Sequence, residues 1–261
     1  MQEHQGVAWG VSDGVGRIEL RRPEHANSLA KRAAHALAAA IDEVLAAGPK
    51  VVVLSAQGRV FCAGGDIQEF VAAGEHFDRL IDEILAPLNP AVERLVSSGV
   101  PIVAAVSGAV GGAGVGVALC ADFVLAAESM KLRTGYAAIG LSPDVGTSYF
   151  LTRRVGATRA KQWLMLSDPI DARECLRCGA VDAVLPDAEL APAVEALVAR
   201  LRAGARHSQA AIKRLCDGAQ SRDLASHLRL EHELLRRAAG TADAREGIRA
   251  FTERRRPGFE D

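Results

Sequence analysis

One aspartate, Asp144, stands in the segment GLSPDVGTSYF (residues 140–150), just before a run that is typical of a helix. Aspartate is a favoured helix N-cap, so one expected role for Asp144 is to accept hydrogen bonds from the first helical turn. A carboxylate also transfers protons well when burial raises its pKa toward neutrality. The residues of this segment leave both roles open.

Two glycine-rich segments, GRVFCAGGDI (58–67) and SGAVGGAGVGVALCAD (107–122), each follow an apolar run and lead toward a predicted helix. Glycine lets backbone N–H groups face a ligand, and a helix N-terminus adds partial positive charge. The second segment fits neither a dinucleotide-binding fingerprint nor a phosphate-binding loop with its GK[ST] ending. Two N–H groups from separate loops, aimed at one point, would form an oxyanion hole for a thioester or ester carbonyl oxygen. Close helix packing is the alternative role of so many small residues.

The elements that must position these residues alternate between strands and helices before residue 187. This alternation predicts an α/β fold made of stacked strand-strand-helix units. Residues 68–90 are less regular and charged, and we expect a mobile helix or lid there. Strands are expected at 7–11, 15–20, 51–55, 101–107 and 122–128, with a helix at 28–47.

From residue 187 onward the pattern predicts helices alone, as in a separate subdomain or an interface. The basic cluster ERRRPGF (253–259) is typical of solvated surface, with contact to an anionic ligand group as the alternative.

Composition excludes several classes of protein. The chain has 261 residues, 24% charged and 49% hydrophobic residues and a net charge of −1, which gives no global attraction to nucleic acid or anionic membranes. No apolar run approaches the roughly 20 residues that span a bilayer, and the N-terminus lacks the pattern of a signal peptide, so a cytoplasmic location is expected.

The CxxC of Cys175 and Cys178 lies in a short helix capped by Asp171 and indicates ordinary thiols. No histidine spacing predicts a metal site.

Six segments together identify a family. Over nearly its whole length the chain resembles the crotonase, or enoyl-CoA hydratase/isomerase, superfamily. The segments that carry the resemblance are RRPEHANSL (21–29), VFCAGGDI (60–67), PIVAAVSGAVGGAGVGVALCAD (101–122), IGLSPDVGTSYFLTRRVGATRA (139–160), DARECLRCGAVDAVLP (171–186) and TADAREGIRAFTERRRPGF (241–259).

The resemblance implies a crotonase-like spiral core over residues 1–200 and a C-terminal helical region over 201–261 that packs into trimers or hexamers. It implies an acyl-CoA thioester as substrate, with coenzyme A entering as part of that substrate and no other cofactor. The oxyanion donors would be the backbone N–H groups of Gly65 and Ala113. Further substrate or CoA contacts would come from His25, Ala26, Ala63, Asp66, Ile67, Gly112, Gly116 and Tyr136.

Two glutamates activate water in the hydratases of this family, and both are missing here, where Gly116 and Tyr136 occupy the matching positions. Some family isomerases keep a catalytic aspartate at the place of Asp144. One carboxylate suffices to shift a double bond, because it removes a proton from one carbon and returns it to another. The resemblance therefore favours an enoyl-CoA isomerase with Asp144 as the proton shuttle.

Three other functions stay open at this point: hydration with an unconventional water activator, hydrolysis or dehalogenation with Asp144 as nucleophile, and acyl-CoA binding without catalysis. Tyr136 is expected to be an apolar wall with a solvated hydroxyl, or else to orient the acyl group or assist the proton relay. Cys62 is expected to pack in the core. Glu69, Glu75 and His76 in the possible lid are expected to be solvated, with a second acid or base as the alternative.

Overall fold

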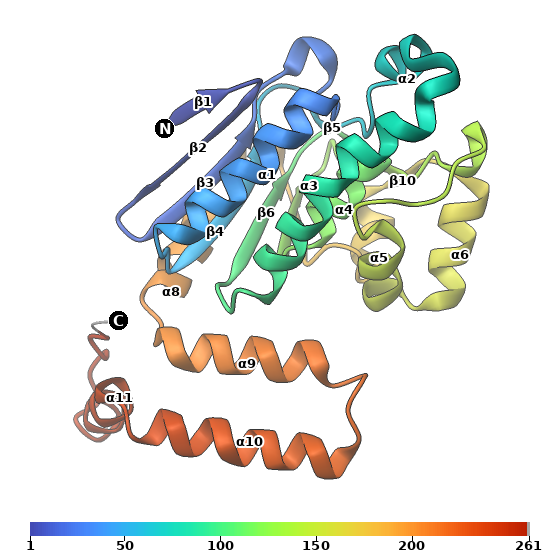
Figure 1. Cartoon of the computed structure of the whole chain (residues 1–261). Coiled ribbons are helices and arrows are strands. Elements are labelled where there is room, and N and C mark those ends of the chain that lie inside the picture. Colours follow the sequence, from blue (N-terminus) through green and yellow to red (C-terminus); the bar gives the residue numbers. More distant parts are fainter. Residues whose placement is uncertain (260–261) are drawn as a thin grey trace.

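The computed structural model describes residues 1–259, and within them the strands form two sheets (Figure 1). The larger sheet has seven strands and the smaller has four. In spatial order the larger sheet contains β1 (Gln2–His4), β2 (Val7–Ser12), β3 (Val15–Leu20), β4 (Val51–Ala56), β6 (Ile102–Val106), β8 (Phe123–Ala127) and β11 (Ala183–Leu185). The smaller sheet contains β10 (Ile170–Asp171), β9 (Lys131–Arg133), β7 (Ala109–Gly111) and β5 (Val60–Cys62).

The larger sheet is covered on both faces, which explains the continuous apolar run of β4. One face packs against α1 (Lys31–Ala46) and α3 (Phe77–Ser97), and the other against α8 (Asp187–Arg202). Successive side chains of a strand point to opposite faces, so every residue of β4 from Val51 to Leu54 is buried. The expected hairpin of β2 and β3 is confirmed by their antiparallel register, and β3, β4, β6, β8 and β11 pair in parallel.

The smaller sheet brings the two glycine-rich turns together. Strands β5 and β7 are parallel neighbours, with Val60 opposite Ala109 and Cys62 opposite Val110. Because the carboxyl ends of parallel strands lie at the same edge of a sheet, the turns that follow these two strands meet there. One turn leads into α2 (Ile67–Ala73) and the other into α4 (Ala113–Leu119).

The first long helix begins later than the sequence predicts, at Lys31 and not at residue 28. Ala26 and Asn27 both have a φ of 51°, which no helix continues. Asn27 holds this turn by donating from its side chain to the carbonyl oxygens of Gln57 and Val60. Such long-range bonds leave no mark in the local sequence pattern.

Residues 68–90, where the sequence predicts a mobile helix or a lid, are helical. After α2 come a short 3-10 turn, η2 (Gly74–His76), and the long helix α3. Leu80, Ile84 and Leu88 recur at the helical period and are buried against α1. The charged residues between them, together with Pro87 and Pro90 inside the helix, obscure this period in the sequence.

Helices connect and follow the remaining strands. Before residue 187 these are α5 (Thr147–Val155), α6 (Ala157–Leu166) and α7 (Ala172–Arg177), with 3-10 turns η1 (Pro23–His25) and η3 (Ala137–Ile139). After α8 come α9 (Arg206–Gly218), α10 (Leu224–Ala239) and α11 (Ala242–Thr252). Figure 1 shows α9 and α10 as a neighbouring pair beside the core. The all-helical character of this region is confirmed, whereas its division from the core at residue 200 falls inside α8 and stays a prediction.

No helix within residues 1–259 is both long and apolar enough to cross a bilayer.

Candidate functional site

A cavity of about 730 Å³ opens between the two glycine-rich turns, α3 and the segment before α5. Its apolar wall includes Phe70, Ile81, Leu85, Ile139 and Leu141. At its other side lie the ends of the two turns, together with a tyrosine and an aspartate. The cavity therefore offers a long apolar surface next to a small group of polar atoms, as is typical of a site for a small molecule with an apolar part.

The two turns touch because they carry glycine at the contact. A methyl group on Gly64, whose φ is 98°, would lie 3.0 Å from the carbonyl oxygen of Gly111 and 3.4 Å from the backbone nitrogen of Ala113. Gly65, the next residue, lines the cavity together with Ala113. Ala113 is the first residue of α4, so its N–H group has no acceptor within the helix.

Asp144 also lines the cavity, and its side chain does not cap α5. The N-cap residue of α5 is Gly146, which has no side chain, and the N–H of Thr147 donates instead to the backbone carbonyl oxygen of Asp144 at 2.8 Å. The carboxylate of Asp144 accepts a hydrogen bond from the hydroxyl of Tyr136, with 2.5 Å between Oη and Oδ1. Of the two roles considered for Asp144, helix capping by its side chain is thus absent.

A strained turn presents Asp144 to the cavity. The next residue, Val145, is buried and has a φ of 45°, and Gly146 follows with a φ of 72°. A β-branched residue in the left-handed region costs about 1–3 kcal/mol, so the surrounding packing must hold it there. Two successive left-handed residues turn the chain sharply between Asp144 and α5.

The expected solvated hydroxyl of Tyr136 is wrong, because the tyrosine is only 6% exposed and its hydroxyl is bonded on two sides. Besides Asp144 it contacts Thr147, at 3.1 Å between Oη and Oγ1. Burial, and then the negative charge of Asp144, raise the pKa of Tyr136. Burial also raises the pKa of Asp144 above its usual value of 3.8, although the hydrogen bond from Tyr136 acts in the opposite direction.

Gly116 lies beneath this group, inside α4, and has no room for a side chain. A methyl group there would lie 2.3 Å from the carbonyl oxygen of Val145 and 2.9 Å from Oγ1 of Thr147. The residues that place Asp144 thus occupy the space that a larger residue at position 116 would need.

The structure brings most of the predicted site residues together. Ala63, Gly65, Ile67, Gly112, Ala113, Tyr136 and Asp144 all line the cavity. His25 and Ala26 lie in and after the turn η1 and are not among its lining residues. Asp66 caps α2 by accepting from the N–H groups of Gln68 and Glu69, and its other oxygen accepts from Ser28.

Three titratable residues lie in and after α2: Glu69 bonds to the backbone, and Glu75 and His76 are exposed. A carboxylate oxygen of Glu69 accepts from the backbone N–H of Lys31 at 2.7 Å, which caps the start of α1. Glu75 and His76 lie exposed in η2. None of these three side chains lines the cavity within the described part of the chain.

Sequence reasoning missed Thr147, Lys131 and Arg133. Lys131 and Arg133 line the cavity from β9 and are exposed. The alternation of polar and apolar residues in KLR was a signal for this short strand, but three residues are too few to be conclusive. Thr147 follows the PDVG turn, where a threonine is typical of a helix start, so its contact with Tyr136 could not be foreseen.

Cys62 is fully buried next to the first glycine-rich turn, and burial raises the pKa of its thiol to about 12. It is therefore protonated at neutral pH and packs in the core, as the sequence predicts. Cys175 is buried within α7 and Cys178 is half-buried directly after it, and both are free thiols. Asp171 caps α7, as the sequence predicts. Within residues 1–259 no three His, Cys, Asp or Glu side chains gather in a way that would hold a metal ion.

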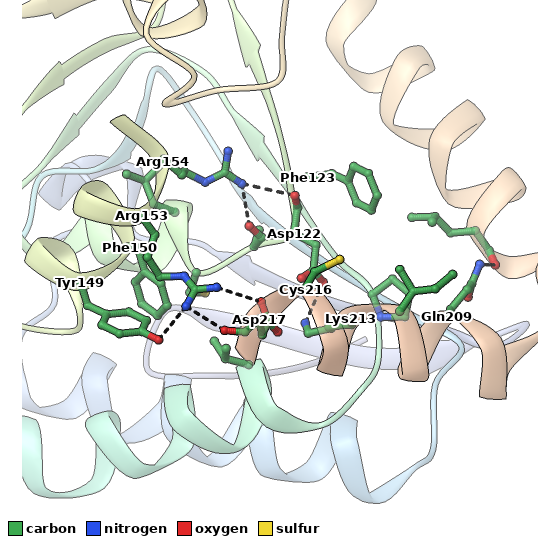
Figure 2. Close-up of a pocket in the computed structure, with 17 residues that line it drawn as sticks. Asp122, Phe123, Tyr149, Phe150, Arg153, Arg154, Gln209, Lys213, Cys216 and Asp217 are labelled. Atoms are coloured by element: carbon green, nitrogen blue, oxygen red, sulfur yellow. Dashed lines mark hydrogen bonds and ion pairs between the residues drawn. The ribbon is translucent and has the colours of Figure 1, made fainter. Parts of the chain in front are cut away.

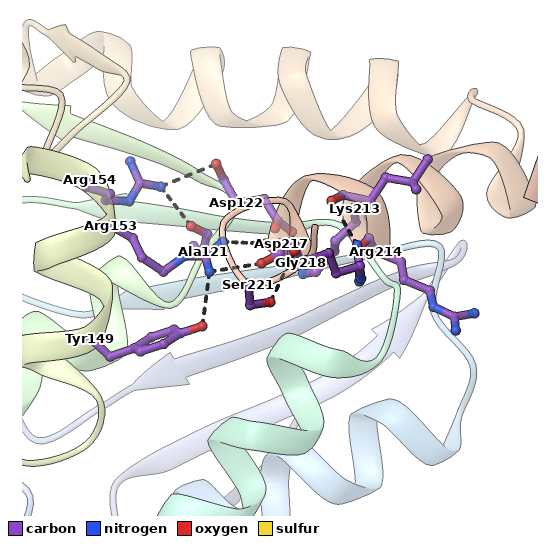
Figure 3. Close-up of polar contacts among 12 residues, drawn as sticks. Ala121, Asp122, Tyr149, Arg153, Arg154, Lys213, Arg214, Asp217, Gly218 and Ser221 are labelled. Carbon is purple, nitrogen blue, oxygen red and sulfur yellow. Dashed lines mark hydrogen bonds and ion pairs between the residues drawn. The ribbon is translucent and has the colours of Figure 1, made fainter. Parts of the chain in front are cut away.

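A second cavity, of about 630 Å³, lies between α5, α9 and the strands of the core (Figure 2). Its cationic groups already have partners. Lys213, from α9, donates to Asp122 at 2.7 Å and to the carbonyl oxygen of Val100 at 3.2 Å. Arg153 donates to the carbonyl oxygen of Asp217 at 3.0 Å and to the hydroxyl of Tyr149 at 3.1 Å (Figure 3). These contacts attach α9 to the core and engage the charges of Lys213 and Arg153.

Comparisons with known proteins point to one enzyme family. A sequence model of the enoyl-CoA hydratase/isomerase family matches residues 10–261. A protein of Rhodobacter capsulatus named probable enoyl-CoA hydratase is 34% identical over 253 residues, with 97% of each chain covered. The trans-2-decenoyl-acyl-carrier-protein isomerase of Streptococcus mutans is 32% identical over 258 residues, again with 97% of each chain covered.

A solved structure of a Thermobifida fusca YX protein in complex with CoA superposes with a TM-score of 0.82 at 30% identity, covering 90% of this chain and 93% of the other. The relatives thus carry both hydratase and isomerase names, and the fold is that of the solved structure.

Proposed function

The chain belongs to the enoyl-CoA hydratase/isomerase family, and on that premise we propose that it shifts the double bond of an unsaturated acyl-CoA thioester. The acyl chain lies along the apolar wall of the cavity, and the thioester carbonyl oxygen lies between the N–H groups of Gly65 and Ala113. Coenzyme A enters as part of the substrate, so this reaction requires no separate cofactor.

The reaction needs one group that removes a proton and returns it. The carboxylate of Asp144 takes a proton from the α-carbon of a 3-enoyl thioester, and the electron pair of the C–H bond moves into a dienolate. The two backbone N–H groups stabilise the negative charge on the thioester oxygen. The carboxylic acid then gives the proton to the γ-carbon, which leaves the double bond between the α- and β-carbons and restores the carboxylate.

One observation carries this proposal: among the described residues that line the cavity, Asp144 is the only one with a carboxylate. Hydration in this family uses two carboxylates around a water molecule, and their positions hold Gly116 and Tyr136 here. The contacts of Gly116 also leave no space for a glutamate. The raised pKa of Asp144 supports a role as base and then acid near neutral pH.

The CoA part of the substrate would extend past Ala63 and Ile67, toward His25, Ala26 and Asp66. Lys131 and Arg133 at the cavity carry positive charge, which complements the phosphates of CoA. Hydration stays the second candidate, because the Rhodobacter capsulatus relative is named a probable hydratase.

Two substrates separate these functions. The purified protein is incubated with crotonyl-CoA and, separately, with 3-hexenoyl-CoA, and the products are identified by mass spectrometry and ultraviolet absorbance. We expect 3-hexenoyl-CoA to be converted to the conjugated 2-enoyl thioester without change of mass, and crotonyl-CoA to gain water at a rate at least ~100-fold lower. Fast formation of 3-hydroxybutyryl-CoA would establish the hydratase instead.

A further inference from the structure

We propose that Tyr136 is a positioning residue for Asp144, which fixes one carboxylate oxygen and leaves the other as the single atom that transfers the proton. This inference rests on the proposed function. The hydroxyl of Tyr136 lies 2.5 Å from Oδ1 of Asp144, and both side chains line the same cavity. Within residues 1–259 the hydroxyl of Tyr136 is the one side-chain group that donates a hydrogen bond to this carboxylate.

The numbers of protons on Tyr136, Asp144 and Thr147 determine which group donates in each hydrogen bond. A tyrosine hydroxyl has one proton, and an ionised carboxylate only accepts, so Tyr136 donates to Asp144. At the 3.1 Å contact between Tyr136 and Thr147, the hydroxyl of Thr147 is therefore the donor. Oγ1 of Thr147 also lies 3.4 Å from the carbonyl oxygen of Gly112, at the start of α4. The single proton of the Thr147 hydroxyl is used at Tyr136, so Thr147 does not also donate to Gly112, and the two hydrogen bonds from Thr147 through Tyr136 tie Oδ1 to α5.

Fixing Oδ1 has a direct consequence for the reaction. Oδ2 of Asp144 removes the proton from the α-carbon and, as part of the acid, returns it to the γ-carbon. Both transfers then take place on the same face of the dienolate, because the carboxyl group does not rotate between them. Tyr136 does not touch the reacting carbons; it acts through Asp144 and keeps its bond to Oδ1 in both protonation states.

The same bond sets the basicity of Asp144. A hydrogen bond to the ionised form lowers the pKa of a carboxylic acid, and burial raises it. The other groups near Asp144 are the thiol of Cys62 on β5, which is neutral, and Lys131 and Arg133 across the cavity on β9. Because the hydroxyl of Tyr136 donates to this carboxylate and favours its ionised form, its removal should raise the pKa of Asp144 further.

The variant Tyr136→Phe removes the hydroxyl and keeps the ring. We expect kcat for 3-hexenoyl-CoA to fall about 10- to 100-fold with KM changed less than about 2-fold, since a hydrogen bond to a charged group is lost and the acyl site is not. The acidic limb of the pH profile should move to higher pH by about one unit. Tyr149→Phe is the matched control, because Tyr149 is the chain's other tyrosine and lies in the second cavity. It should behave like the unmodified protein.

The titration of Asp144 itself separates this inference from the proposed function. Carbon-13 NMR of protein labelled at the aspartate carboxyl, with the signal assigned through Asp144→Asn, gives the pKa without substrate. We expect a higher pKa in Tyr136→Phe than in the unmodified protein, and a smaller increase in Thr147→Val. The second variant carries the test if the first does not fold.

An unchanged pKa of Asp144 in both variants, or a Tyr136→Phe protein with unchanged kcat and pH profile, would overturn the inference. A protein that converts no 3-enoyl thioester but shows the expected titration would instead overturn the proposed function.

Discussion

The absence of a side chain at Gly116 leaves space for the residues that hold Asp144 and Tyr136 in the site. The carbonyl oxygen of Val145 and the hydroxyl of Thr147 fill the space where a side chain at 116 would lie. These atoms belong to the turn and helix that hold Asp144 and Tyr136 in place. A glutamate at 116 and the present placement of Asp144 therefore exclude each other.

The first prediction tests this exclusion. Gly116→Glu should not produce a hydratase, and it should lower the free energy of unfolding by about 1–3 kcal/mol or more, because it overpacks a closed space. Gly116→Ala should already be destabilised in the same direction. Gly135→Ala serves as a control, since no atom lies within 4 Å of the added methyl group, although its φ of 75° adds some strain. Urea denaturation and crotonyl-CoA hydration are measured for all three. A stable Gly116→Glu variant that hydrates crotonyl-CoA would contradict this account.

The second prediction concerns the pH dependence of stability. The pKa of Asp144 is raised in the folded protein, so between its usual value of 3.8 and the raised value the folded state binds more protons than the unfolded state. Asp144 therefore reduces stability as pH rises through this window. The variant Asp144→Asn has no titrating group at this position, so it does not lose this stability as pH rises. Its free energy of unfolding, relative to the unmodified protein, should increase as pH rises from about 4 through the raised pKa of Asp144. A relative stability that falls over this range in urea denaturation would contradict the raised pKa.

Much of the site could be predicted from residue types, and its hydrogen bonds could not. The two glycine-rich turns and Asp144 were visible because their spacing matches a known family. The bonds from Tyr136 to Asp144 and Thr147 join residues 8 and 11 positions apart through a turn with a left-handed valine. That backbone conformation is unusual for valine, so the local sequence predicts a plain helix cap instead.

At the level of elements, a largely buried ion pair is one of the contacts that attach α9 to the core. Nζ of Lys213 and Oδ2 of Asp122 are 2.7 Å apart, and their side chains are 7% and 24% exposed. Asp122 also accepts from the backbone N–H of Ile102, and burial raises its pKa despite the nearby lysine. The pair thus joins α9 to the start of β6.

The third prediction is that Lys213→Met destabilises the fold by about 3 kcal/mol, because it leaves the carboxylate of Asp122 buried without its cation. Adding Asp122→Asn should restore part of this loss. Lys31→Met is the control, since the side chains of Lys31 and Glu83 are 40% and 53% exposed and their ion pair should contribute little to stability. Chemical denaturation measures the three variants and the unmodified protein. Equal losses for the two lysine variants would show that α9 is held by other contacts.

Helices and strands could be predicted where apolar residues recur without interruption. The prediction was weaker where prolines or charged residues interrupt that pattern. Strand β4 and the helices after residue 187 were found, because an apolar run or a helical period marks each of them. For the region of α3 the sequence left a mobile helix and a lid as alternatives, because Pro87 and Pro90 and several charges fall among its buried residues. The late start of α1 depends on bonds from Asn27 to residues more than 30 positions away.

At the level of the whole molecule, α10 and α11 carry large apolar side chains that the chain itself does not cover. They are Leu224, Leu228, Leu235, Ile248 and Phe251, each between 52% and 86% exposed. Exposed apolar residues on neighbouring helices are typical of an interface. We propose that these helices pack against other copies of the chain, in a trimer or a hexamer.

The fourth prediction tests that assembly. Sedimentation of the unmodified protein should give the mass of a trimer or hexamer. The double variant Leu235→Asp and Phe251→Asp should dissociate toward the 27.5 kDa monomer, because it places charges in an apolar contact. Asp substitutions at Arg236 and Arg254, which are exposed charges, provide the control. A monomeric unmodified protein at micromolar concentration would contradict the proposal.

The central claim is that Asp144 is the proton shuttle of an enoyl-CoA isomerase, and the conversion of 3-hexenoyl-CoA by Asp144→Asn tests it most directly. The amide keeps the size of the side chain and is able to accept the hydrogen bond of Tyr136, but it does not act as a base at neutral pH. We predict that kcat/KM falls at least ~100-fold while the affinity for a saturated acyl-CoA, measured by calorimetry, stays within about 3-fold. An Asp144→Asn protein that isomerises 3-hexenoyl-CoA at the unmodified rate would contradict the account.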